Sequence, residues 1–350
     1  MPPSSPATGD VTARCAARGE AADGRHEPTA AADETNTDVF PAVSVVICAY
    51  TMRRWAYLQQ ATAAVRFQSI QPLEAILVVD GNPELLERAR AELRDLTVIP
   101  NTRMAGSSGA RNTGAAASQG EIIVFLDDDI VADSAWLETV LGHFARPEVI
   151  GVGGRAKPLW QHSCPAWFPP EFYWVVGASY AGMPEHVGPV RNVWSSNMAV
   201  RRAVFEKAGG FRDELAKVAS RNRPDDTDLC LRAAVAQESG IWIYEPAALA
   251  SHWVPPERAV FRYFLIRCYH EGVGKGALAA FNGLRASTSV ERRYIRRVLS
   301  AALRRYSSGA LTGQFSDFWR IAATMAGLGV AIVGFLLGAG RYYLRRLARR

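Results

Sequence analysis

The sequence predicts an α/β fold in which flanking helices cover a mostly parallel β-sheet, with a helical extension at the C-terminus. Two patterns predict it. From Val43 onward, short apolar runs rich in β-branched residues alternate with stretches of helical periodicity, which is typical of βαβ units. From Arg258 onward the pattern is helical only. The composition, 49% hydrophobic and 21% charged over 350 residues, suits one large domain with appended segments.

The strands are predicted from short apolar runs that are bounded by polar or turn residues. In chain order they are Val43–Ala49, Ala75–Val79, Leu96–Ile99, Glu121–Leu126, Val149–Gly153 and Ile241–Tyr244. Ligands of such sheets bind beyond the carboxyl ends of the strands. The segments that follow three of these strands are therefore candidate site segments: Tyr50-Thr51, Asp80-Gly81-Asn82 and Asp127-Asp128-Asp129.

The helices between the strands are predicted from their periodicity, and Pro83 marks one start because proline suits a first helical turn. In chain order they are Trp55–Phe67, Pro83–Arg94, Gly109–Ser118, Ala135–Phe144 and Asp226–Gln237. The segment from Arg155 to Trp194 lacks a clear period, so it is either functional or mobile. Its aromatic run Trp167–Trp174 is predicted either to face sugar or lipid, or to form an apolar plug over the sheet.

The basic charge of the chain is concentrated in its last quarter. Residues 256–350 hold 17 Lys/Arg against four Asp/Glu, whereas residues 41–255 hold 20 Lys/Arg against 23 Asp/Glu. This asymmetry argues against a nucleic-acid-binding chain and for a basic appendage that meets an anionic surface. Residues 321–340 carry no charge and are long enough to cross a bilayer. This segment contains five glycines and is followed by the Arg-rich end of the chain, so whether it spans the membrane or dips into it stays open.

The chain therefore divides into four predicted segments. Residues 1–40, without an apolar run, are predicted as a disordered leader that lacks a signal peptide. Residues 41–255 form the α/β domain, residues 256–316 a basic helical extension, and residues 317–350 a membrane-associated segment. The five cysteines are an odd number without a CxxC spacing, which indicates a reducing compartment rather than disulfides or structural zinc. The oligomeric state is left open.

Two groups of aspartates are candidates for chemistry. Asp127, Asp128 and Asp129 follow a strand, where adjacent carboxylates need a counter-charge. A divalent cation supplies one, since hard oxygen ligands suit magnesium or manganese and Asp127 and Asp129 point the same way in an extended stretch. The alternative is a solvated acidic turn. Asp225 and Asp226 open a helix, where they either stabilise its N-terminus or provide a general base that removes a proton from a hydroxyl.

The stretch Gly106–Gly114 is a glycine-rich entry to a helix. Its unpaired backbone N–H groups suit an anion, and Arg111 can make paired hydrogen bonds to a phosphate or a base edge. The sequence has no GxGxxG directly after the first strand, no GxxxxGK[ST] loop and no GxSxG elbow. These absences argue against a dinucleotide-binding fold, an NTPase and a serine hydrolase.

Taken together, these motifs resemble the inverting nucleotide-sugar glycosyltransferases of family 2, which have the GT-A fold. The resemblance runs from about Val43 to His252 and rests on the opening strand and on Asp80-Gly81-Asn82, Ala110–Gly114, Phe125–Asp129, Asn197-Met198, Arg201-Arg202, Gly209-Gly210-Phe211 and Asp225–Leu229. More narrowly, Val79–Leu85, Gly153-Gly154-Arg155 and Trp167–Gly177 resemble glucosyl-dolichyl-phosphate glucuronosyltransferases and their bacterial relatives.

The resemblance implies a role for each matching residue. Asp80 would contact the nucleotide base or ribose, and Arg111, with its neighbour Asn112, would lie near the base and phosphates. Asp127 and Asp129 would bind Mn²⁺ or Mg²⁺ and, through this ion, the donor diphosphate, and His252 would approach the metal. Asp226 or Asp225 would be the catalytic base. Asp225 replaces a glutamate of the family pattern, so which of the two aspartates acts stays open. For His252 the alternative is a packed or capping residue.

The implied reaction is an inverting transfer from a nucleotide-sugar donor, with UDP-glucuronate or a UDP-hexose as the best match. The acceptor would be a hydroxyl of a polyprenyl-linked sugar or a cell-envelope glycan. The implied location is the cell membrane, with the catalytic domain on the cytoplasmic side. The alternatives are a family member acting on a soluble or exopolysaccharide acceptor, a sugar nucleotidyltransferase, and a non-catalytic sugar-binding module.

Overall fold

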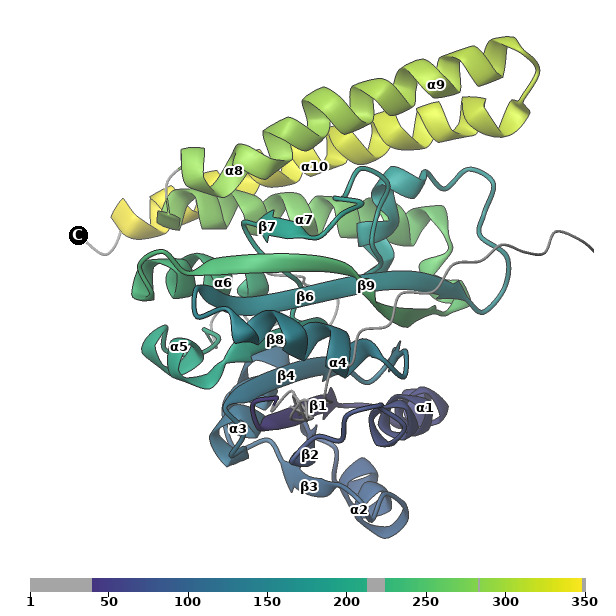
Figure 1. The fold of residues 1–350 in the computed structure, drawn as a ribbon. Coiled ribbons are helices and arrows are strands. Elements are labelled where there is room, and N and C mark those ends of the chain that lie inside the picture. The colour runs from purple at the N-terminus through teal and green to yellow at the C-terminus, as the bar shows by residue number, and fades with distance from the viewer. Residues whose placement is uncertain (1–39, 213–223, 283, 348–350) are drawn as a thin grey trace, which may run out of the picture. The chain divides into compact units, whose positions relative to one another are not determined.

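The computed structural model describes residues 40–212, 224–282 and 284–347 (Figure 1). The predicted leader lies outside these ranges except for Phe40. Within them, one nine-stranded sheet has the order β3-β2-β1-β4-β8-β6-β9-β5, and β7 pairs with β9. The strands are β1 (Val43–Ala49), β2 (Glu74–Val79), β3 (Thr97–Pro100), β4 (Ile122–Asp127), β5 (Ile130–Ala132), β6 (Val149–Trp160), β7 (Gly188–Val190), β8 (Asn197–Arg201) and β9 (Ile241–Val254).

All six predicted strands are present, and three more were not predicted. The first half of the sheet, β3-β2-β1-β4, is parallel as expected. Strand β8 then runs antiparallel to both β4 and β6, β9 is parallel to β6, and β5 and β7 are antiparallel to β9. The second half is therefore mixed. Strand β8 follows the long irregular segment rather than a crossover helix, so no βαβ connection fixes its direction.

Helices cover both faces of the sheet (Figure 1). They are α1 (Trp55–Arg66), α2 (Pro83–Glu92), α3 (Ser107–Ala117), α4 (Trp136–Leu141), α5 (Arg202–Lys207) and α6 (Asp225–Ala236). Val45 and Ile47 of β1 pack with α1, α2 and α4, whereas Val46 packs with α3, α5 and α6. Alternate residues of a strand point to opposite faces, and both faces are covered, which is why β1 is apolar at every position except Ser44.

A third apolar cluster joins the aromatic run to the helical extension. The extension consists of α7 (Phe261–Asn282), α8 (Leu284–Arg293), a π-helical turn (Tyr294–Leu299), α9 (Ser300–Leu311) and α10 (Phe315–Leu347). Phe168 and Phe172 are almost fully buried, and their rings pack against Phe264 of α7 in edge-on and tilted arrangements, at ring-centroid distances of 5.4 and 5.3 Å. The run is therefore mainly an apolar plug, although Trp174 also lines the cavity described below.

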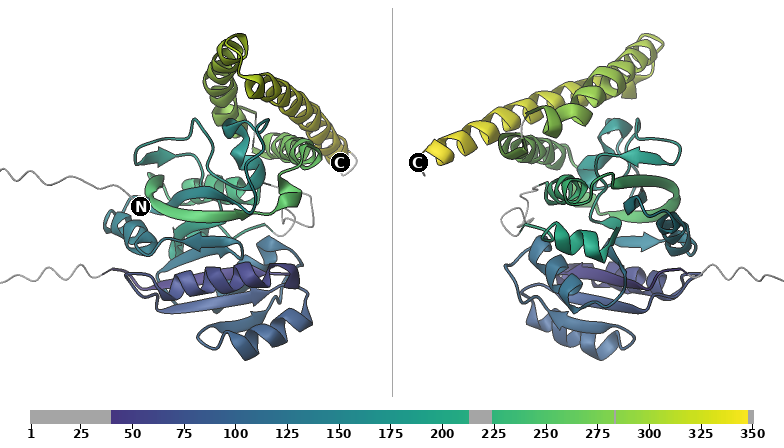
Figure 2. Two further views of the ribbon diagram at one scale, coloured as in Figure 1. Left: turned by 90° about the vertical axis from the view of Figure 1, so that its right-hand side faces the viewer. Right: turned by 60° about the vertical axis from the view of Figure 1, so that its left-hand side comes forward.

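Helix α10 lies alongside α7, and the views of Figure 2 agree on this. A Cβ atom at Gly272 would collide with the backbone of Ala331, and one at Gly338 with the backbone of Val273. Both helices thus use glycines four residues apart, at 272 and 276 and at 334 and 338, to bring their backbones into contact. Gly334 and Gly338 of the uncharged segment thus serve helix packing, which the sequence pattern did not reveal.

Candidate active site

A cavity of about 1490 Å³ lies beyond the carboxyl ends of β1, β2 and β4. Its walls also include the segment around residues 172–196, the first turn of α6 and parts of α7, α8 and α10. Six predicted site residues line it: Asp80, Arg111, Asp127, Asp129, Asp226 and His252. The sequence placed Asp80, Asp127 and Asp129 at one edge of the sheet, and the structure gathers all six residues around one cavity.

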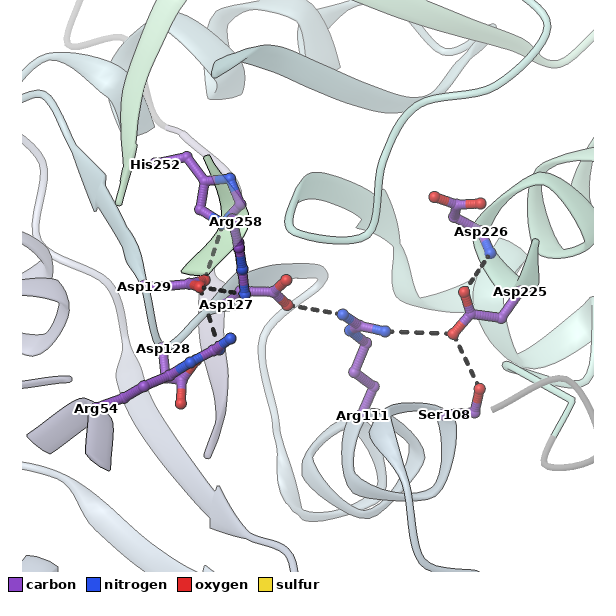
Figure 3. Close-up of polar contacts among 10 residues, drawn as sticks. All are labelled: Arg54, Ser108, Arg111, Asp127, Asp128, Asp129, Asp225, Asp226, His252 and Arg258. Carbon is purple, nitrogen blue, oxygen red and sulfur yellow. Dashed lines mark hydrogen bonds and ion pairs between the residues drawn. The ribbon is translucent and has the colours of Figure 1, made fainter. Parts of the chain in front are cut away.

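Arg111 connects the two groups of aspartates (Figure 3). It lies in α3 with 2% of its surface exposed, and its Nη2 donates to Asp127 Oδ1 at 2.7 Å. On its other side, Nη1 lies 3.4 Å from Asp225 Oδ2. Burial lowers the pKa of Arg111, but Asp127 and Asp225 outweigh that effect and raise it above its usual value. Arg111 is thus a fixed cation between the acids.

Asp129 is surrounded by three cationic or imidazole groups (Figure 3). His252 Nε2 lies 3.0 Å from its Oδ1, and Arg54 Nη1 and Arg258 Nη2 lie 3.1 and 3.3 Å from its Oδ2. Strand pairing explains the histidine contact, because Ile130 of β5 lies opposite His252 of β9. Burial raises the pKa of Asp129, but these three neighbours together hold it well below its usual range.

Asp128 differs from its two neighbours in the same turn. Its Oδ1 accepts a hydrogen bond from Arg54 at 2.7 Å, and its Oδ2 is buried without a hydrogen-bond partner. Burial raises the pKa of Asp128 to about 7, since the opposite charge of Arg54 offsets only part of it and Asp129 adds repulsion. Asp128 and Asp129 are therefore buried and share Arg54, while Asp127 pairs with Arg111, so the three do not form the solvated acidic turn considered as an alternative.

The aspartates at the start of α6 have different surroundings. Asp225 is fully buried, accepts a hydrogen bond from Ser108 Oγ at 3.0 Å, and is not among the cavity-lining residues that the structure describes. Asp226 is half-buried and lines the cavity. A residue that takes a proton from a bound hydroxyl must reach the substrate. This difference favours Asp226 over Asp225 as the base, a choice that the sequence left open.

Asp80 and Asn112 mainly hold backbone segments in place. The two oxygens of Asp80 accept hydrogen bonds from Asn101 Nδ2 at 2.7 Å and from the backbone N–H of Gly106 at 2.8 Å. Asp80 thereby fixes the entry to α3 while still lining the cavity. The Asn112 amide is buried and exchanges two hydrogen bonds with the backbone of Phe211, and among the described residues it is not part of the cavity wall. Its position supports the fold rather than contact with a nucleotide.

Sequence reasoning identified Arg111 but missed two other cations that contact the aspartates, Arg54 and Arg258. Arg54 belongs to the 3₁₀ turn Met52–Arg54, and Arg258 ends the turn Pro256–Arg258. Neither lies in a motif, and both reach the aspartates only through the fold. Three adjacent carboxylates signal that counter-charges exist, but they do not identify which residues supply them.

The residues present fit a divalent metal ion, although within the described ranges no group of three or more His, Cys, Asp and Glu side chains forms a complete metal site. Asp127 and Asp129 offer the carboxylate oxygens that Mg²⁺ and Mn²⁺ prefer. The Asp127 side chain is 27% exposed on the cavity wall, and His252 Nδ1 is buried without a hydrogen-bond partner. An ion with so few protein ligands takes its others from water or phosphate oxygens.

The chain is similar to known proteins. The model of the family described as glycosyl transferase family 2 matches residues 44–209. The chain is 31% identical over 239 residues to a glucosyl-dolichyl phosphate glucuronosyltransferase of Haloferax volcanii. This match covers 67% of this chain and 76% of that protein. It is 30% identical over 189 residues to a pre-mycofactocin glycosyltransferase of Mycobacterium tuberculosis, over 53% of this chain and 38% of that one.

Two solved structures share the fold. One is a mannosyltransferase from Pyrobaculum calidifontis in complex with GDP-Man and Mn²⁺, with a TM-score of 0.54, 19% identity, and coverage of 85% of this chain and 87% of that one. The other is GalNAc-T7 with UDP, GalNAc and Mn²⁺, with a TM-score of 0.51, 12% identity, and coverage of 75% and 57%. The predicted GT-A fold is confirmed. The fold and the matches define a glycosyltransferase enzyme. The chain belongs to glycosyltransferase family 2.

Proposed function

We propose that this glycosyltransferase transfers a sugar, with inversion, from a nucleoside diphosphate donor to a hydroxyl of a lipid-linked sugar at the membrane. One observation carries the proposal. The cavity that holds Asp226 and Asp127 continues to Leu328, Ile332 and Phe335 of α10, so the polar groups and an apolar wall bound the same space. The similarity to a protein named for a dolichyl phosphate-linked acceptor supports this choice, and it makes UDP-glucuronate or a UDP-hexose the preferred donor.

The proposed mechanism assigns a task to each part of the site. Asp226 accepts the proton of the attacking hydroxyl, which strengthens the nucleophile at the anomeric carbon. A divalent ion held by Asp127 and Asp129, with His252 beside them, would neutralise negative charge on the leaving diphosphate. Arg111 fixes Asp127 through its ion pair, and Asp80 fixes the entry to α3. Attack on the face opposite the diphosphate inverts the anomeric configuration.

The test measures product formation with a panel of donors and acceptors. The purified full chain in detergent should release UDP from UDP-glucuronate or a UDP-hexose in the presence of Mn²⁺ and a polyprenyl phosphate-linked glucose. The lipid product should gain one sugar by mass spectrometry. Transfer to soluble oligosaccharides alone would replace the proposed acceptor with the alternative soluble one. Absence of transfer from every nucleotide sugar would contradict the proposed reaction.

We also propose that α10 lies in the cytoplasmic leaflet of the membrane rather than crossing the bilayer. Among the described residues, the helical segment Phe315–Arg341 is long and apolar enough to cross a membrane. It packs, however, along α7, which carries Arg262, Glu271 and Lys275 and therefore does not suit a bilayer core. An interfacial position keeps both the Arg-rich end and the catalytic domain on the cytoplasmic side, which positively charged segments favour, whereas a single crossing would put them on opposite sides of the membrane.

Exposed apolar residues of α10 should carry the membrane affinity. Phe318, Trp319 and Leu336 are 59%, 60% and 64% exposed. Since burial of each such side chain contributes about 1.5–3 kcal/mol, changing all three to glutamine should weaken binding to phospholipid vesicles more than about 100-fold. The matched control replaces three exposed apolar residues of the α/β domain by glutamine: Phe67, Leu73 and Val235. Equal losses in both triple variants in a vesicle sedimentation assay would rule out α10 as the membrane contact.

A further inference from the structure

Four arginines form a cluster on the helical extension. Arg292 and Arg293 end α8, and Arg296 and Arg297 lie in the π-helical turn that follows; together they are called the arginine cluster. With Ser289 they line a hollow of about 310 Å³. Ser289, Arg292 and Arg293 also line the large cavity. The hollow therefore adjoins the space that contains the candidate active site.

Within the part of the chain that the structure describes, the arginine cluster has no carboxylate as a counter-charge. Two other cations of the extension are paired: Lys275 lies 2.9 Å from Glu291, and Arg305 lies 2.7 Å from Glu171. Among the described residues, no carboxylate pairs with any member of the cluster. Like charges on adjacent turns of a helix repel each other, and the four arginines of the cluster lie within two successive helical turns. Such an arrangement is stabilised when an anion binds.

The nearest acid on the same helix is already committed to other partners. Glu291 directly precedes the cluster, and Arg191 binds both of its oxygens at 3.0 and 2.9 Å while Lys275 lies 2.9 Å away. Burial raises the pKa of Glu291, but Lys275 and Arg191 outweigh it and lower the pKa to about 2. This network joins α8 to α7 and to the segment before β8. It holds the end of α8 in place and leaves the arginines available to a ligand.

The groups that line the cavity indicate the chemistry of that ligand. A carboxylate (Asp226), two guanidinium groups (Arg292 and Arg293) and two apolar side chains (Ile332 and Phe335) line the same cavity. A molecule that carries a sugar hydroxyl, a phosphate and a hydrocarbon chain matches all three. We propose that the arginine cluster binds the phosphate or diphosphate that joins the acceptor sugar to its lipid. This inference rests on the proposed function and adds to it a binding site for the acceptor.

The test is the double variant Arg292→Gln/Arg293→Gln in the full chain. Arginine makes strong, paired hydrogen bonds to phosphate, so KM for a polyprenyl phosphate-linked glucose should rise about 10-fold to 100-fold. The Kd for the nucleotide sugar and the rate of transfer to octyl glucoside, which has no phosphate, should not change. The arginines are exposed, and loss of their mutual repulsion should leave the melting temperature unchanged or higher.

A matched control separates the acceptor phosphate from anionic bilayer headgroups. Arg262 and Arg304 are exposed, belong to the same extension and line neither cavity, so Arg262→Gln/Arg304→Gln removes the same charge. The proposal expects normal KM in this control. It would be overturned by equal KM increases in both double variants, by an equal loss with octyl glucoside, or by an unchanged KM in Arg292→Gln/Arg293→Gln. Transfer to octyl glucoside tests the proposed reaction separately, since it does not require the cluster.

Discussion

Replacement of Asp226 by asparagine should abolish glycosyl transfer while leaving donor binding intact. Asparagine has the same shape as aspartate, but it cannot take a proton from the acceptor hydroxyl. Loss of a general base typically lowers the rate by about 10²–10⁴-fold. Asp226 lines the cavity at the first turn of α6, whereas the buried Arg111 lies against Asp225 and Asp127. The variant should therefore bind the nucleotide sugar with an unchanged Kd in calorimetry and release nucleoside diphosphate far more slowly.

The matched control is Asp225→Asn, one residue away. Asp225 is buried and holds both Ser108 and Arg111, so its neutral replacement should lower the melting temperature and weaken donor binding through Arg111. The two variants thus differ in kind: one loses turnover, and the other loses stability and affinity. If Asp226→Asn retained near-normal turnover while Asp225→Asn lost turnover with a normal donor Kd, the two assignments would be reversed.

The sequence predicted the parallel half of the fold well because its central strands, β1 and β4, are buried on both faces. Strand β1 is apolar at nearly every position and begins and ends as predicted. Strand β8, Asn197–Arg201, mixes polar and apolar residues and follows a segment without periodicity, so its pattern is not distinctive. Strands β6 and β9 continue past their predicted ends through a register shift near Gly154 and Arg155. Irregular pairing of this kind leaves no periodic signal.

The site was predicted in its acids and in Arg111, but not in Arg54 and Arg258. Carboxylates that follow strand ends are recognisable, since the strand pattern places them at the ligand-binding edge. Arg54 and Arg258 lie 74 and 129 residues from the aspartates that they contact, and an isolated arginine in a loop carries no information about its partner. The burial of Asp225 was also unpredictable, because two adjacent aspartates at a helix start are equivalent in sequence until packing separates them.

Replacement of Asp129 by alanine should cause the largest loss of stability at the site and remove metal-dependent donor binding. Asp129 is buried and contacts His252, Arg54 and Arg258. Removal of one partner of a buried ion pair typically costs about 3–5 kcal/mol, because the remaining charges stay buried without compensation. Urea denaturation should show this loss of unfolding free energy, and titration should show no Mn²⁺-dependent binding of the nucleotide sugar.

A second variant, Asp127→Asn, distinguishes lost metal binding from lost folding. The Asp127 side chain is 27% exposed and bonds Arg111, which keeps its contact with Asp225 when the charge of Asp127 is removed. The free energy of unfolding should therefore stay close to that of the unmodified chain. Mn²⁺ binding, followed by electron paramagnetic resonance, should nevertheless weaken by about 10-fold or more, because a carboxylate ligand has become a neutral amide. A folded Asp127→Asn variant that binds Mn²⁺ as tightly as the unmodified chain would contradict the assignment of this aspartate to the metal.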